Sequence, residues 1–119
     1  MGPTSIGHDF DAWCEREMRP WVEEHIRIDN AQRRRWLGAD IDLTAKLPSD
    51  LIMKAAQVDP SIQPAAWAYA AMTDGATCLE PFEEQARAVY RTGWRPPFSD
   101  GPSRDELAMI ISADRSLAA

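Results

Sequence analysis

Mostly apolar side chains recur at spacings of three and four residues over the first third of the chain. They are Phe10, Trp13, Cys14, Met18, Trp21, Val22, His25 and Ile28, and the charged residues Glu15, Glu17, Glu23, Glu24 and Arg27 fall on the other side. This period is typical of one amphipathic helix. We predict that the helix begins near Asp9, an N-cap residue, and ends at Gly38. Pro20 should kink it or split it in two.

Four shorter helical patterns follow a linker at residues 39–48. The first runs from Ser49, its expected N-cap, to about Val58. The second, residues 61–72, follows the cap and proline of Asp59-Pro60. The third begins at Pro81, and the last opens at a capping box formed by Ser103 and Glu106. The residues expected to face inward are Leu51, Ile52 and Ala55; Ile62, Ala65, Ala66, Tyr69 and Met72; Phe82, Ala86, Val89 and Tyr90; and Leu107, Ile110 and Ile111.

These elements predict an all-α fold of about five helices, packed as one irregular domain over residues 1–119. A Pro-rich connector, residues 94–102, precedes the last helix. A chain of 119 residues fits one domain and can bury a core without disulfides or a structural metal. The ends, residues 1–8 and 113–119, are expected to be disordered or frayed.

The pattern over residues 61–72 is apolar on most sides, which is typical of a central helix or of one that a partner covers. The chain also contains five tryptophans. Aromatic and methionine side chains are enriched at the centres of protein interfaces. We therefore predict a contact or pocket surface formed by Trp67, Tyr69, Met72 and Trp94. The alternative, that these residues belong to the core, stays open.

Candidate catalytic and metal-binding groups are few. His25 and Asp29 are four residues apart on one helix, but no second ligand pair matches them, and a hydrogen-bonded histidine is commoner there. Cys14 and His25 are separated by about 16 Å along a helix, which is too far for proton transfer. Glycine-rich nucleotide motifs are absent. We therefore assign no catalytic, cofactor-binding or metal-binding residue.

Charge and hydropathy exclude several partners. The formal charge of −6 disfavours nucleic acid. The basic run at residues 33–35 lies at the expected end of the first helix, where positive charge complements the helix dipole. No apolar run approaches the roughly 20 residues of a membrane span, and no signal peptide is expected. Cys14 and Cys78 fit no metal or redox spacing, so a reducing cytoplasm is the expected compartment.

Short motifs are spread along nearly the whole chain. They are Trp13-Cys14-Glu15, Arg19-Pro20-Trp21-Val22-Glu23, Arg34-Arg35-Trp36, Asp42-Leu43-Thr44, Leu47-Pro48-Ser49-Asp50-Leu51-Ile52, Asp59-Pro60-Ser61-Ile62, Ala86-Arg87-Ala88-Val89-Tyr90, Gly93-Trp94-Arg95-Pro96-Pro97 and Asp100-Gly101-Pro102-Ser103-Arg104-Asp105-Glu106-Leu107. Together they resemble the C-terminal region of FAD-dependent oxidoreductases related to styrene and indole monooxygenases. These motifs are helix boundaries and core positions rather than catalytic residues.

The resemblance implies a two-component monooxygenase. In such families a separate reductase supplies reduced FAD, and a flavin hydroperoxide passes oxygen to an apolar alkene or arene. The family's FAD-binding fold and substrate sheet have no counterpart in these residues, so no FAD-binding or catalytic residue carries over. The chain alone is expected to bind no cofactor. The implied function is a helical domain that packs on the FAD-binding and substrate domains around Trp67, with Trp13 or Trp21 as further contacts.

Two other hypotheses remain open at this point. The chain would also suit a stand-alone helical interaction module that pairs with a second copy of itself. A small-ligand carrier would instead need an internal cavity, which we would expect Tyr69, Met72 and Tyr90 to line.

Overall fold

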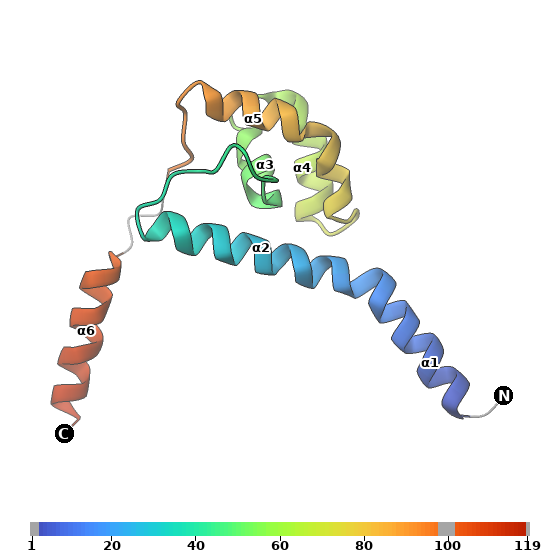
Figure 1. The fold of residues 1–119 in the computed structure, drawn as a ribbon, viewed down its shortest axis with the longest axis horizontal. Helices are drawn as coiled ribbons and strands as arrows, with labels where there is room; N and C mark the ends of the chain where they lie inside the picture. Colours follow the sequence, from blue (N-terminus) through green and yellow to red (C-terminus); the bar gives the residue numbers. More distant parts are fainter. Residues whose placement is uncertain (1–2, 98–101, 119) are drawn as a thin grey trace.

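The computed structural model describes residues 3–97 and 102–118, and it confirms an all-α fold without strands in those ranges. A long N-terminal helix forms a base, and a compact unit of α3, α4 and α5 packs along one side of it (Figure 1). The last helix, α6, lies apart from this unit. Counting the long helix once, the described chain has five helical segments, as the sequence predicts.

The long helix consists of α1 (Pro3–Trp13), a π-helical turn (Cys14–Met18) and α2 (Arg19–Trp36). The break falls where Pro20 predicts it. Proline has no N–H to continue the α-helical ladder, and just before it the Arg19 N–H donates to the carbonyl of Cys14, five residues back. Gly38, with φ of +98°, ends the helix as expected.

Both ends of the described chain are helical. The first helix begins at Pro3 rather than near Asp9, and α6 (Arg104–Leu117) continues close to the C-terminus. The fraying of residues 1–8 and 113–119 stays a prediction.

The core lies between α3 (Ser49–Ala55), α4 (Gln63–Ala70) and α5 (Glu83–Arg91). Two 3-10 segments, Pro60–Ile62 and Ala76–Phe82, lead into α4 and α5. Most of the predicted inward residues are buried here: Leu51, Ile52, Ala55, Ile62, Ala66, Tyr69, Ala86, Val89 and Tyr90. The spacing of apolar residues therefore identified the packed faces of these three helices correctly.

Two aromatic pairs join the core to its surroundings. Trp21 on α2 stacks on Tyr69 of α4, with ring centroids 5.5 Å apart. Tyr90 on α5 stacks on Trp94, with centroids 5.8 Å apart, and its hydroxyl donates to the carbonyl of Leu51. Each tyrosine ring is thus buried and stacked on a tryptophan ring.

The side of α2 that faces the core coincides only in part with the apolar stripe that the sequence predicts, because Trp21 of that stripe packs on the core whereas other members do not. Glu24, expected on the solvent side, is only 6% exposed and accepts hydrogen bonds from Ser49. Ser49 is the first residue of α3 rather than its side-chain N-cap, because its hydroxyl is committed to Glu24. Met18 and Val22, expected to be covered, are exposed. The prediction was wrong because a buried carboxylate that is hydrogen-bonded can replace an apolar contact.

Further differences concern α4 and α6. Helix α4 ends at Ala70, two residues before the end that the sequence predicts. Met72 lies beyond it with φ of +57°, which turns its side chain away from the core face. The capping box of Ser103 and Glu106 is present, as predicted. However, Ile110 and Ile111 of α6 are exposed and Leu107 is only half-buried, so their predicted inward position is wrong.

The molecule is extended as a result. Its radius of gyration is 19.2 Å, whereas a compact domain of this length has about 13–14 Å. The long helix reaches well beyond the core at its N-terminal end, and α6 projects at the other side (Figure 1). Apolar residues on these projecting helices therefore have no partner surface among the described core elements.

Candidate functional site

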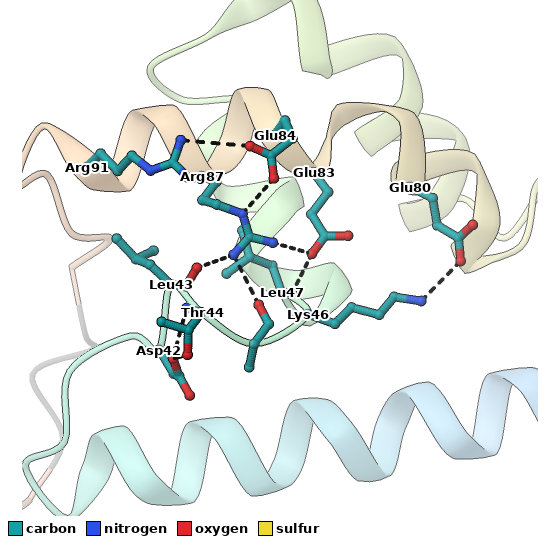
Figure 2. Close-up of polar contacts among 11 residues, drawn as sticks. Asp42, Leu43, Thr44, Lys46, Leu47, Glu80, Glu83, Glu84, Arg87 and Arg91 are labelled. Atoms are coloured by element: carbon teal, nitrogen blue, oxygen red, sulfur yellow. Dashed lines mark hydrogen bonds and ion pairs between the residues drawn. The ribbon is translucent and has the colours of Figure 1, made fainter.

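Residues 39–48, called the strap here, cross from α2 to α3 and are held by one buried arginine (Figure 2). Arg87 of α5 donates through Nη1 to the carbonyls of Leu43 and, at 3.0 Å, of Ala45. Its other nitrogens bind Glu84 at 2.8 Å and Glu83 at 2.7 Å. All three guanidinium nitrogens therefore donate hydrogen bonds, and those from Nη1 fix the strap to α5.

The carboxylate of Glu83 continues this network. Its Oε1 also accepts the backbone N–H of Leu47 at 2.9 Å. One glutamate therefore joins the Arg87 side chain to the end of the strap. Glu83 and Arg87 are four residues apart on α5, the spacing at which opposite charges pair along a helix. The contacts of Arg87 with the strap, some 40 residues away in sequence, carry no local sequence signal.

Ion pairing and local turns fix the start of the strap. The carboxylate of Asp40 binds Arg95 through both oxygens, at 2.6 and 2.9 Å, and also accepts the Ile41 N–H. The hydrogen bond from Arg95, followed by that from Ile41, lowers the pKa of Asp40 to about 2. Asp42 accepts the backbone N–H and the hydroxyl of Thr44, and these bonds lower its pKa as well. Both carboxylates are therefore ionised at neutral pH.

A groove of about 410 Å³ lies between the strap and the C-terminal half of α2. Its apolar part comes from Ile41, Leu47 and Leu51, which belong to the core. Its polar part includes Arg27, Asn30, Arg34 and Arg35 of α2, with Asp40, Asp42 and Lys46 of the strap. The volume falls within the range of small-molecule pockets, which is roughly 300–1,000 Å³. This groove and the outer side of the long helix are the two candidate functional surfaces.

The second surface is a row of six large apolar side chains on the long helix that we call the outer stripe. It comprises Ile6, Phe10, Trp13, Met18, Val22 and Ile26, all of them exposed. Ile26 lies two positions from both Glu24 and Ile28, which is about 200° around an α-helix, so it points away from the core. Phe10 and Trp13 stack on each other, with ring centroids 6.2 Å apart. Exposed apolar patches of this kind mark sites of association.

The four predicted contact residues do not form one surface. Trp67 and Met72 are 69% and 70% exposed, whereas Tyr69 is buried against Trp21 and Trp94 packs on Tyr90. Tyr69 and Trp94 therefore pack with the core, which is the alternative that the sequence left open for them. Trp67 and Met72 stay candidate contacts on α4 and the turn after it. None of Tyr69, Met72 and Tyr90, proposed as a cavity lining, lines the groove described above.

The remaining polar candidates have local partners. His25 donates a hydrogen bond from Nδ1 to the carbonyl of Trp21, at 2.8 Å. Cys14 and Cys78 are free thiols, and each is half-buried.

Across residues 3–97 and 102–118, no group of three His, Cys, Asp or Glu side chains is placed to hold a metal ion. None of the helices described there has the length and apolar character needed to cross a membrane.

Comparisons with known proteins give no family for this chain. No family model matches it, and neither the curated proteins nor the solved structures contain a significant match.

Sequence reasoning missed the groove and the buried Glu24. One signal for Glu24 is present: Trp21, Glu24 and Ile28 are spaced by three and four residues, so they share a helix face. The groove has no such signal, because its walls come from a helix and a linker whose distance depends on Arg87 and Arg95.

Proposed function

We propose that this chain is a helical docking domain, whose outer stripe binds another polypeptide. The observation that carries the proposal is the exposure of the stripe on the side of the long helix that faces away from the core. Val22 and Ile26 are each 56% exposed there, and the aromatic pair of Phe10 and Trp13 extends the stripe beyond the core. Burying such side chains stabilises a complex by roughly 1.5–3 kcal/mol each before the costs of association.

For the partner, we propose the FAD-binding and substrate domains of a monooxygenase related to styrene monooxygenase. The support is the set of motifs along the chain that resemble the C-terminal region of that family. Several of these motif residues have structural roles: Trp21 stacks on Tyr69, Arg87 holds the strap, and Ser103 forms the capping box. In this proposal the partner holds FAD and performs the oxygen chemistry, while this domain helps to close the substrate cavity.

The experiment mixes the purified chain with the FAD-binding and substrate domains of a styrene monooxygenase, expressed without their own C-terminal helical region. Sedimentation velocity, followed at the flavin absorbance, reports whether the chain joins the flavoprotein. We expect a faster-sedimenting flavoprotein species that contains one copy of the chain. If the folded chain leaves the sedimentation of the flavoprotein unchanged, this choice of partner is wrong.

A second candidate, self-association, is favoured by the charge pattern along the long helix. Residues 9–24 contain six acidic and two basic side chains, whereas residues 25–37 contain one acidic and four basic side chains. Two copies aligned antiparallel would place the acidic half of each helix beside the basic half of the other. This arrangement gives electrostatic complementarity and buries both stripes at once.

Sedimentation of the chain alone distinguishes the two candidates. Self-association predicts a species of twice the 13.4 kDa monomer mass that weakens at high salt, because exposed charges are screened. Docking on the flavoprotein predicts a monomer, or a dimer that dissociates when the flavoprotein is added. A salt-sensitive dimer that persists beside the flavoprotein would support self-association and contradict the first candidate.

The reducing cytoplasm is the compartment that we propose for this domain. Its support is that Cys14 and Cys78 are both free thiols, as is usual for proteins of that compartment.

A further inference from the structure

The groove beside the strap has one wall formed by a single face of α2. Arg27, Asn30 and Arg34 line it, and their spacing of three and four residues places them above one another along the helix. The turn at the end of α2 bounds this wall, since the Ala39 N–H donates to the Arg34 carbonyl at 3.0 Å. Three side chains with N–H donors therefore point along one line of the groove.

Another part of the groove lining is apolar and buried. Leu47 and Leu51 are almost fully buried, and Ile41 is nearly so. These three side chains belong to the core cluster, so the surface that they present to the groove is held by packing from behind. A ligand lying in the groove would meet both apolar carbon and N–H donors.

Most of the charges around the groove already have partners. Arg27 binds Glu24 at 2.5 Å, and Lys46 binds Glu80 at 3.1 Å. Asp40 is paired with Arg95. Arg34 differs: within residues 3–97 and 102–118, its guanidinium takes part in no hydrogen bond or ion pair that joins it to a neighbouring side chain. It is nevertheless close enough to Asp42 to lower the pKa of that carboxyl.

We propose that the groove binds a small organic monocarboxylate, with its carboxylate on Arg34 and Asn30 and its apolar body on Ile41, Leu47 and Leu51. The planar guanidinium of arginine matches a carboxylate in a two-bond arrangement, and the Asn30 amide is a further donor. A site with an apolar side and a few convergent polar groups is the usual form of a small-molecule pocket.

The fixed charges of the strap argue for a single negative charge on the ligand. Asp40 and Asp42 are both in the groove lining, and both are ionised at neutral pH because hydrogen bonds lower their pKa values. They would repel a phosphate dianion more strongly than a monocarboxylate. Arg87 and Arg95 hold the strap in place before any ligand arrives, which lowers the ordering cost of binding.

The test uses 2-naphthoate as the probe and the neutral 2-naphthalenemethanol as its uncharged counterpart. Amide shifts of the 15N-labelled chain are followed as each probe is added. We expect saturable shifts with naphthoate, concentrated at residues 39–47 and at α2 from residue 27 onward. The neutral probe should bind at least tenfold more weakly, because it lacks the charge-assisted bond to arginine.

Arg34→Gln and Arg33→Gln form a matched pair, since both remove one charge from adjacent exposed positions, and only Arg34 lines the groove. We expect Arg34→Gln to weaken naphthoate binding at least tenfold, Arg34→Lys to retain part of it, and Arg33→Gln to leave it within twofold. The proposal is overturned if naphthoate gives no saturable shifts, if the shifts lie elsewhere, or if the two glutamine variants lose affinity equally. It does not depend on the docking proposal, because substitutions in the outer stripe should leave naphthoate binding unchanged.

Discussion

Glu24 on α2 accepts two hydrogen bonds from Ser49, one from its backbone N–H at 2.7 Å and one from its hydroxyl at 2.5 Å. Arg27 supplies a third bond to the other carboxylate oxygen. This contact joins the long helix to the first helix of the core, on the same side of α2 as the Trp21 ring that stacks on Tyr69. With Glu24 and Trp21 facing inward, Val22 and Ile26 are left exposed, so the outer stripe follows from these two contacts.

Replacing the anchor should destabilise the fold. Glu24→Ala leaves the buried Ser49 N–H and hydroxyl without their acceptor, and we expect a loss of about 3 kcal/mol in the free energy of unfolding. Glu23→Ala removes a neighbouring charge that is exposed, and it should cost less than about 0.5 kcal/mol. Urea denaturation followed by circular dichroism measures both values. Equal losses for the two variants would show that the Ser49 contact does not hold the helix in place.

Arg87 should be equally important for the strap. Arg87→Met removes the donor to the carbonyls of Leu43 and Ala45 and leaves Glu83 partly buried without its cation. We expect a loss of roughly 3–5 kcal/mol, as for other broken buried ion pairs. Hydrogen exchange of the Leu47 amide should also become much faster, because its acceptor Glu83 is no longer held.

Arg91→Met is the matched control for that experiment. Arg91 lies one turn further along α5, and its contact with Glu84 is long, 3.7 Å, and exposed. Its loss should leave both the stability and the exchange of Leu47 nearly unchanged. If Arg87→Met behaves like Arg91→Met, the network drawn in Figure 2 does not hold the strap.

The two tyrosines predict a loss of stability in alkaline solution. Burial raises the pKa of Tyr90 and of Tyr69 above the ordinary value of 10.0. A raised pKa in the folded state means that the contribution to stability is fully present below about pH 10 and is lost as the pH rises further. Because the chain has two tyrosines, tyrosinate absorbance at 295 nm should rise together with loss of helical circular dichroism. Tyrosinate forming at pH 10 in a fully helical protein would contradict the packing of both rings.

The pairing of Asp40 with Arg95 predicts the opposite behaviour at low pH. The pKa of Asp40 is lowered from 3.8 to about 2, so the contact is fully present above pH 4 and is lost as the pH falls through 2. Arg95→Gln should raise the pKa of Asp40 towards its ordinary value, because the largest cause of the lowering is removed. Carboxyl 13C shifts measured between pH 1.5 and 6 give this pKa directly. An unchanged Asp40 titration in Arg95→Gln would mean that the ion pair does not form in solution.

The parts of the fold that the sequence predicted correctly are those with strong local signals. The seam of Ala86, Val89 and Tyr90 follows from its spacing. The break at Pro20 and the capping box at Ser103 follow from residue chemistry alone. Each of these features depends on residues within one or two helical turns of one another.

The sequence did not reveal which face of an amphipathic helix is covered. The stripe containing Met18 and Val22 and the apolar residues Ile110 and Ile111 of α6 show the period of buried faces, but the described core covers neither. The spacing of apolar residues along a helix indicates that one face is suited to burial. It does not indicate whether the surface that covers this face belongs to the same chain. The groove escaped prediction for a different reason, because long-range contacts of Arg87 and Arg95 create it.

The most direct test of the docking proposal compares two sets of substitutions in the sedimentation experiments, with the flavoprotein domains and with the chain alone. The double variant Val22→Glu, Ile26→Glu places charge in the outer stripe, while Trp67→Glu places it on an exposed aromatic residue of α4. We predict that the double variant stays helical but loses association, and that Trp67→Glu associates like the unmodified chain. The proposal is contradicted if the unmodified chain associates with neither partner, or if Trp67→Glu abolishes association while the double variant retains it.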